Sequence, residues 1–112
     1  MKLPYMPFFV DDYYADTIGL SALEHAGYIL LLLAYWKRQG PLPKDDKKLA
    51  AMACMSPREW KSIRQDVLSF FEECGETLVH KRVEKELNDA RERVERARSA
   101  GVASGQARRN GR

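Results

Sequence analysis

The chain has 112 residues, of which 45% are hydrophobic and 31% are charged, a balance typical of one globular domain. Its longest apolar run, Tyr28 to Trp36, covers nine residues, whereas a membrane span needs roughly 20. The start of the chain is interrupted by Pro4 and Pro7 and has no signal-peptide pattern. We therefore expect a cytoplasmic protein without a membrane-spanning segment.

Cysteine and histidine are both scarce. Cys54 and Cys74 are fewer cysteines than a small secreted disulfide fold usually carries, so we expect two reduced, mostly buried thiols. The two histidines, His25 and His80, do not complete a zinc site with them, because no pair has the short spacing that such sites use. We expect no metal ion and no other cofactor.

The net charge of +3 is unevenly distributed. Residues 1–79 contain 9 Lys/Arg and 11 Asp/Glu, whereas residues 80–112 contain 10 Lys/Arg and 5 Asp/Glu. This asymmetry favours contact between the last third and a nucleic acid or another acidic partner.

Residues 3–18 are rich in aromatics and predict an extended arm followed by a short helical turn near residues 11–16. We expect most of these aromatic side chains to pack on the core. The first long helix begins after Ser21, because Ser21 and Glu24 form a capping box, and Gly40 and Pro41 end it. Its apolar surface predicts the central helix of the domain.

The middle of the chain predicts a helix-turn-helix. A short helix from Asp45 or Asp46 to about Cys54 is followed by a turn and by a helix over residues 57–71, capped by Ser56 and Glu59. Gly75 predicts the turn of a hairpin in which residues 77–81 pair with residues near 70–72.

A last helix over residues 82–99 carries a narrow apolar seam, formed by Val83, Leu87, Ala90, Val94 and Ala97. The predicted fold is mainly α with a small β-hairpin: a winged helix-turn-helix with an extra C-terminal helix. It occupies residues 1–100, and residues 101–112 are expected to form a basic disordered tail or linker.

No group of residues predicts catalysis, so we expect a binding protein and not an enzyme. Asp11, Asp12 and Asp16 are expected to cap the short helical turn, in preference to acid–base work. For His25 we expect packing or a surface hydrogen bond, and for His80 a place in a basic wing beside Lys81.

Nucleic-acid recognition is the strongest remaining reading. With Trp60 facing inward, the helical repeat places Lys61 at the edge of the outer face of the third helix. The residues on that face are Arg58, Ser62, Gln65 and Ser69. Such side chains can read bases and hold phosphates, and a solvated helix face needs the same residue types. Asp66 lies close by and opposes binding of an anion. Lys81 and Arg82 would add positive charge at the wing.

Several segments together resemble the YdaU-like domain of phages and prophages. They are residues 8–17 (FFVDDYYADT), 20–28 (LSALEHAGY), 40–43 (GPLP), 56–60 (SPREW) and 80–82 (HKR), and the likeness covers roughly residues 4–100. One departure is the "PGD" step of the family's N-terminal arm, which here is Val10-Asp11-Asp12. The resemblance implies a phage or prophage protein, similar to the N-terminal part of a replication initiator, and brings no established activity.

We therefore expect a DNA-binding module that serves DNA replication initiation or its control in the cytoplasm of a bacterial host cell. The alternative is a protein-interaction module, which would dimerise through the last helix or dock a replication protein such as a helicase or its loader.

Overall fold

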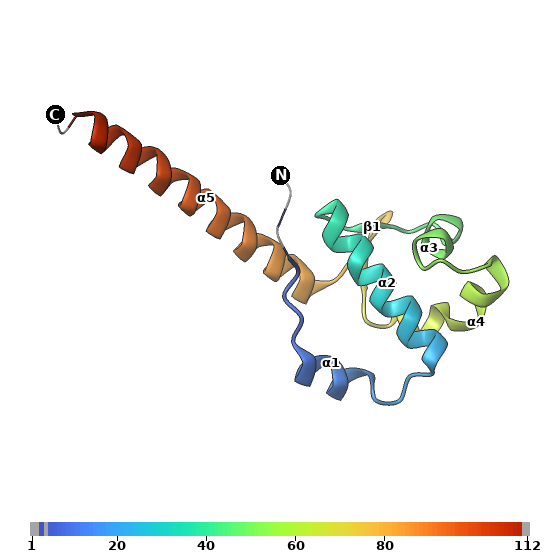
Figure 1. The fold of residues 1–112 in the computed structure, drawn as a ribbon. Coiled ribbons are helices and arrows are strands. Elements are labelled where there is room, and N and C mark those ends of the chain that lie inside the picture. The colour runs from blue at the N-terminus through green and yellow to red at the C-terminus, as the bar shows by residue number, and fades with distance from the viewer. Residues whose placement is uncertain (1–2, 4, 111–112) are drawn as a thin grey trace.

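The computed structural model describes residue 3 and residues 5–110, and the side chains of residues 102–110 lie outside this description. The described chain is mainly helical, with one small antiparallel sheet (Figure 1). Its elements are, in order, α1 (Val10–Thr17), α2 (Ala22–Arg38), β1 (Leu42–Pro43), α3 (Asp46–Met52), α4 (Pro57–Leu68), β2 (Glu72–Cys74), β3 (Thr77–Val79) and α5 (Lys81–Asn110).

The central helix, α2, begins where the sequence predicts. The Ser21 side chain accepts from the backbone N–H of Glu24, and the Glu24 carboxylate accepts from the backbone N–H of Ser21. The helix ends at Gln39, which adopts a left-handed conformation with φ 57°, one residue before the expected stop at Gly40. Leu31 and Tyr35 of α2 are fully buried, so this helix forms the middle of the core.

Helices α2 and α4 approach each other closely at Gly27. A Cβ atom at this position would lie 2.5 Å from Cδ1 of Ile63 and 3.4 Å from Cε of Met55. Gly27 therefore allows α4 to pack directly against the backbone of α2.

Local capping fixes the ends of α3 and α4. The Asp45 side chain accepts from the backbone N–H of Lys48, and Ser56 and Glu59 form the second predicted capping box, with Pro57 in the first turn. Both starts are confirmed, because each depends on residues within one helical turn.

The sheet differs from the prediction in extent and register. Its strands lie in the order β1-β3-β2, and Leu42 pairs with Leu78 in a two-residue strand that was not predicted. In the hairpin, Cys74 pairs with Thr77 and leaves a two-residue turn headed by Gly75, whose φ is 63°. Strand β2 is therefore closer to the turn than predicted, and α4 ends at Leu68.

Helix α5 is longer than expected and has two different halves. Val83, Leu87 and Ala90 pack into the core, and the guanidinium of Arg91 donates to the carbonyl of Gln39. The helix then leaves the body and continues to Asn110, where a disordered tail from residue 101 was predicted (Figure 1). No proline interrupts residues 101–110, so the helical hydrogen-bond pattern can continue in spite of two glycines.

The prediction of buried cysteines is wrong, because Cys54 and Cys74 are both exposed. Cys54 lies in the tight turn after α3 with φ 57°, and Cys74 ends a hairpin strand whose residues are all exposed. Within the described residues, no helix is long and apolar enough to cross a membrane.

Candidate recognition surfaces

The outer face of α4 presents the residues that the sequence predicts for nucleic-acid contact. Arg58, Lys61, Ser62 and Gln65 are all exposed. Within the part of the chain that the structure describes, neither Arg58 nor Lys61 forms an ion pair. The hydroxyl of Ser62 donates to the carbonyl of Glu59 at 2.6 Å, so its oxygen remains able to accept.

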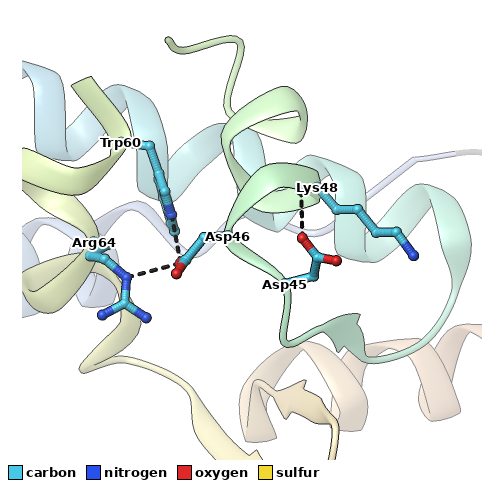
Figure 2. Close-up of polar contacts among 5 residues, drawn as sticks. All are labelled: Asp45, Asp46, Lys48, Trp60 and Arg64. Atoms are coloured by element: carbon cyan, nitrogen blue, oxygen red, sulfur yellow. Dashed lines mark hydrogen bonds and ion pairs between the residues drawn. The ribbon is translucent and has the colours of Figure 1, made fainter. Parts of the chain in front are cut away.

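Asp46 holds α4 against α3. One carboxylate oxygen accepts from Nε1 of Trp60 at 3.0 Å and from Nε of Arg64 at 2.9 Å (Figure 2). Both hydrogen bonds lower the pKa of Asp46, and the bond from Trp60 has the larger effect. Because Trp60 is buried, this link fixes the angle between the two helices and hence the direction of the outer face of α4.

Two further cations, which were not predicted at this surface, lie beside it. Lys47 and Arg64 line a hollow between α3 and α4 together with Lys61. Arg64 lies three residues after Lys61. Because this spacing places both side chains on one side of a helix, the sequence could have predicted Arg64 as part of this surface. Lys47 reaches the same hollow only through the packing of α3 on α4.

A pair of carboxylates borders this surface. Glu24 at the start of α2 faces Asp66 of α4, and this neighbour raises the pKa of Asp66 while the pKa of Glu24 is lowered. Asp66 was expected to oppose anion binding, and Glu24 adds a second acid beside it.

Lys81 and Arg82 lie on a different surface and have acidic partners. Nζ of Lys81 is 2.9 Å from a carboxylate oxygen of Glu72, and the Arg82 guanidinium pairs with Asp12. The same guanidinium lies 4.7 Å above the ring of Phe9. The structure thus keeps these two cations apart from the α4 group and engages both with neighbouring side chains.

The β2–β3 hairpin is acidic. It carries Glu72, Glu73 and Glu76, and Glu73 pairs with Lys44 at 2.8 Å. The prediction that His80 belongs to a basic wing is wrong, because this residue follows β3 and is buried.

His80 is part of the core hydrogen-bond network. Its Nδ1 accepts from the backbone N–H of Val83 at 3.3 Å, so the neutral ring carries its proton on Nε2, which lies 2.7 Å from the Tyr28 hydroxyl. Burial, and secondarily the nearby Arg82, lowers the pKa of His80. Burial likewise raises the pKa of Tyr28.

A cavity of about 450 Å³ opens between the N-terminal arm, α2 and the start of α5. Tyr28 stacks on Phe70 with ring centroids 4.5 Å apart and on Tyr13 at 5.8 Å. Most aromatics of the arm do not pack on the core as expected: Phe8 and Phe9 keep 46% and 45% of their surface exposed, and Tyr5 and Tyr14 keep more.

Helix α1 is attached by a few polar contacts. Tyr13 Oη lies 2.9 Å from Nδ1 of His25, which confirms the expected hydrogen bond of that histidine. The predicted side-chain cap by an aspartate is wrong, because Phe9 occupies the N-cap position without a side-chain bond. Asp11 and Asp12 instead lie in the first turn, where negative charge is favoured by the helix dipole.

Comparisons with known proteins agree with the resemblance seen in the sequence. The model of a family described as a protein of unknown function (DUF1376) matches residues 4–88. A protein of Escherichia coli strain K12, described as uncharacterized protein YdaU, is 42% identical over 108 residues. The match covers 96% of this chain and 37% of that protein, so the chain spans little more than a third of its relative.

No solved structure matches the chain. The family match covers most of the chain, and the identity to YdaU extends over nearly all of it. The chain therefore belongs to the DUF1376 family of YdaU-like domains.

Proposed function

We propose that this chain is a DNA-binding winged helix-turn-helix module in which α4 enters the DNA groove. The succession α2, β1, α3, α4 and the β2–β3 hairpin, with strand order β1-β3-β2, supports this interpretation. In such a module the second helix of the helix-turn-helix reads the major groove, and the hairpin is the wing.

The observation that carries the proposal is the availability of charge on α4. Arg58 and Lys61 are exposed and, among the described residues, have no acidic partner, while Gln65 offers an amide on the same face. An arginine or glutamine on a groove-facing helix can bond base edges, and a lysine can neutralise a phosphate. Lys47 of α3 supplies a further cation at the edge of this surface.

The acidic β2–β3 hairpin changes which residues we expect to contact DNA. Because the hairpin residues 72–79 include three glutamates and no lysine or arginine, the proposed wing offers no cation of its own to phosphate and is not the principal DNA contact. We therefore assign the contact to Arg58, Lys61, Ser62 and Gln65, with Lys47 beside them, and we assign Lys81 and Arg82 a structural role.

The setting that we propose for this activity is the one that the family resemblance suggests. The YdaU-like resemblance supports a role in phage or prophage DNA replication initiation or its control, in the cytoplasm of the host cell. The proposed action is binding without catalysis, and neither a metal ion nor a cofactor takes part in it.

The test is a fluorescence anisotropy titration of labelled duplex and single-stranded DNA over a range of salt concentrations. Phosphate contacts make log affinity fall linearly with log salt, with a slope of about −0.9 per neutralised phosphate for duplex DNA. Lys61→Ala should weaken binding to all sequences and reduce that slope by about 1, and Arg58→Ala should lose about 1–3 kcal/mol if it reads a base.

The matched control is Lys37→Ala, which removes one exposed cation at the end of α2. It should leave affinity and slope unchanged. The proposal is wrong if the wild-type chain binds neither form of DNA at low salt, or if the three variants weaken binding equally.

A further inference from the structure

The aromatic cavity beside the N-terminal arm is separate from the DNA surface proposed for α4. We propose that this cavity binds an extended peptide segment of a partner protein, in which a bulky apolar side chain is adjacent to a lysine or arginine. The apolar side chain would occupy the cavity, and the cation would lie at its rim.

The walls of the cavity suit an apolar side chain. Tyr28, which contacts Phe70 and Phe71, lines the cavity with them, and Phe8 and Phe9 of the arm line it as well. A volume of about 450 Å³ is within the range of pockets that enclose a ligand, and it is ample for one large side chain. The half-exposed rings of the arm would gain apolar contact when the cavity is filled.

The charges around the cavity favour a cation. Lys81 and Arg82 line it, but each is paired with an acid, so their positive charge is partly compensated. Asp16 and Glu86 also line it and, among the described residues, form no ion pair. Two uncompensated carboxylates beside aromatic rings attract an ammonium or guanidinium group through ion pairing and cation–π contact.

An unused hydrogen-bond donor favours a peptide over a simple amine. Trp36 lines the cavity with 8% of its surface exposed, and within the described chain its buried Nε1–H has no acceptor. A buried donor without a partner is unfavourable, and a backbone carbonyl of the bound peptide would supply the missing acceptor. Because Nε1 is buried, a peptide carbonyl reaches it only when the lining of the cavity shifts.

The experiment follows the two indole N–H resonances of the full chain in ¹H–¹⁵N correlation spectra, with Trp36 assigned by comparison with Trp36→Phe. The probe is the peptide acetyl-Lys-Leu-Phe-Lys-amide. Two control peptides replace either both lysines by glutamate or both Leu and Phe by alanine. The lysine peptide should shift the Trp36 resonance and bind about tenfold more tightly than either control, equivalent to about 1.4 kcal/mol.

Variants of the chain test the rim. Asp16→Asn combined with Glu86→Gln should weaken the lysine peptide about three- to tenfold, as expected for two exposed ion pairs. The control Glu95→Gln, an exposed acid farther along α5, should have no effect. A circular dichroism spectrum identical to wild type would establish that the double variant is folded.

Three outcomes overturn the proposal. One is the absence of a Trp36 shift up to about 5 mM peptide, weaker than any useful affinity. The second is equal binding of the glutamate peptide. The third is a shift of Trp36 by oligothymidylate and not by the peptide, which would assign the cavity to nucleic acid.

Discussion

The outer face of α4 and the rim of the aromatic cavity each carry two cationic residues, but their electrostatic surroundings differ. Among the described residues, Arg58 and Lys61 have no acidic partner, whereas Lys81 and Arg82 are paired with Glu72 and Asp12. Lys81 and Arg82 lie in the more basic part of the sequence, and yet theirs is the charge that neighbouring acids compensate. A count of charges along a segment does not give the potential at a surface, because acids brought in by folding decide how much charge remains.

The first prediction concerns the packing that supports both surfaces. Gly27→Leu should lower the free energy of unfolding by about 2–3 kcal/mol, because the new side chain overlaps Ile63 and Met55 in a packed interface. Urea unfolding followed by circular dichroism measures this change. Gly27→Ala is the graded control: its smaller overlap meets only a flexible methyl and is offset by about 1 kcal/mol of helix propensity. Equal stability of Gly27→Leu and wild type would contradict the close packing of α2 on α4.

The second prediction separates the two surfaces. Asp46→Ala should destabilise the fold by about 1–2 kcal/mol, because the indole N–H of buried Trp60 loses its acceptor. DNA affinity should fall, while peptide binding at the cavity should persist. Glu95→Ala serves as the control, since it removes an exposed acid of α5 far along the chain from this link and should change neither stability nor DNA affinity.

Low pH should abolish the difference in stability between wild type and Asp46→Ala. The folded-state pKa of Asp46 is lowered, so its carboxylate stabilises the fold above the pKa of the unfolded chain, and the contribution is lost as pH falls through the folded value. Wild type and Asp46→Ala should therefore converge in stability at low pH. A constant difference down to acid pH would indicate that Asp46 contributes through packing alone.

The third prediction concerns the core behind the cavity. His80 has a lowered folded-state pKa, so below about 6.5, the ordinary value, the unfolded chain takes up a proton that the folded chain resists. Stability should therefore decrease as pH falls through this window, and His80→Gln should remove that part of the slope. The control His25→Gln retains His80 and should retain this step. Urea midpoints measured between about pH 8 and pH 5 would show the difference.

The smallest effects are expected at the rim of the cavity. Lys81→Ala and Arg82→Ala each break one exposed ion pair, and such pairs contribute little to stability because solvent screens them. Neither should change the salt dependence of DNA binding. A decrease of about 1 in the slope for either variant would place that residue on a phosphate and end the distinction between the two surfaces.

Local chemistry made part of the fold predictable. The two capping boxes, at Ser21 and at Ser56, set the starts of α2 and α4 through contacts three residues apart, and both starts are confirmed. The family could also be predicted, because its motifs are spread over nearly the whole chain. The mainly helical class with a small sheet is likewise confirmed.

Long-range contacts account for what the sequence did not reveal. Strand β1 has two residues and exists only because Leu42 meets Leu78 across the sheet. Arg82 pairs with Asp12, which lies seventy positions earlier in the chain. The ring of His80 contacts the hydroxyl of Tyr28, which lies 52 positions earlier. Periodicity and spacing carry no information on such pairs, so the charge of the β2–β3 hairpin and the burial of His80 had to be observed.

Helix α5 is continuous from the core to Asn110, so a small rotation of the core moves its far end through a larger distance. About 20 residues separate Ala90, the last core contact, from Asn110, which at 1.5 Å per residue corresponds to an arm of about 30 Å. A rotation of the core by about 10° would move the far end by about 5 Å, as follows from that length. Reorientation of the domain on a binding partner would thus be converted into a directed displacement, because the first turns of the helix are fixed in the core and turn with it.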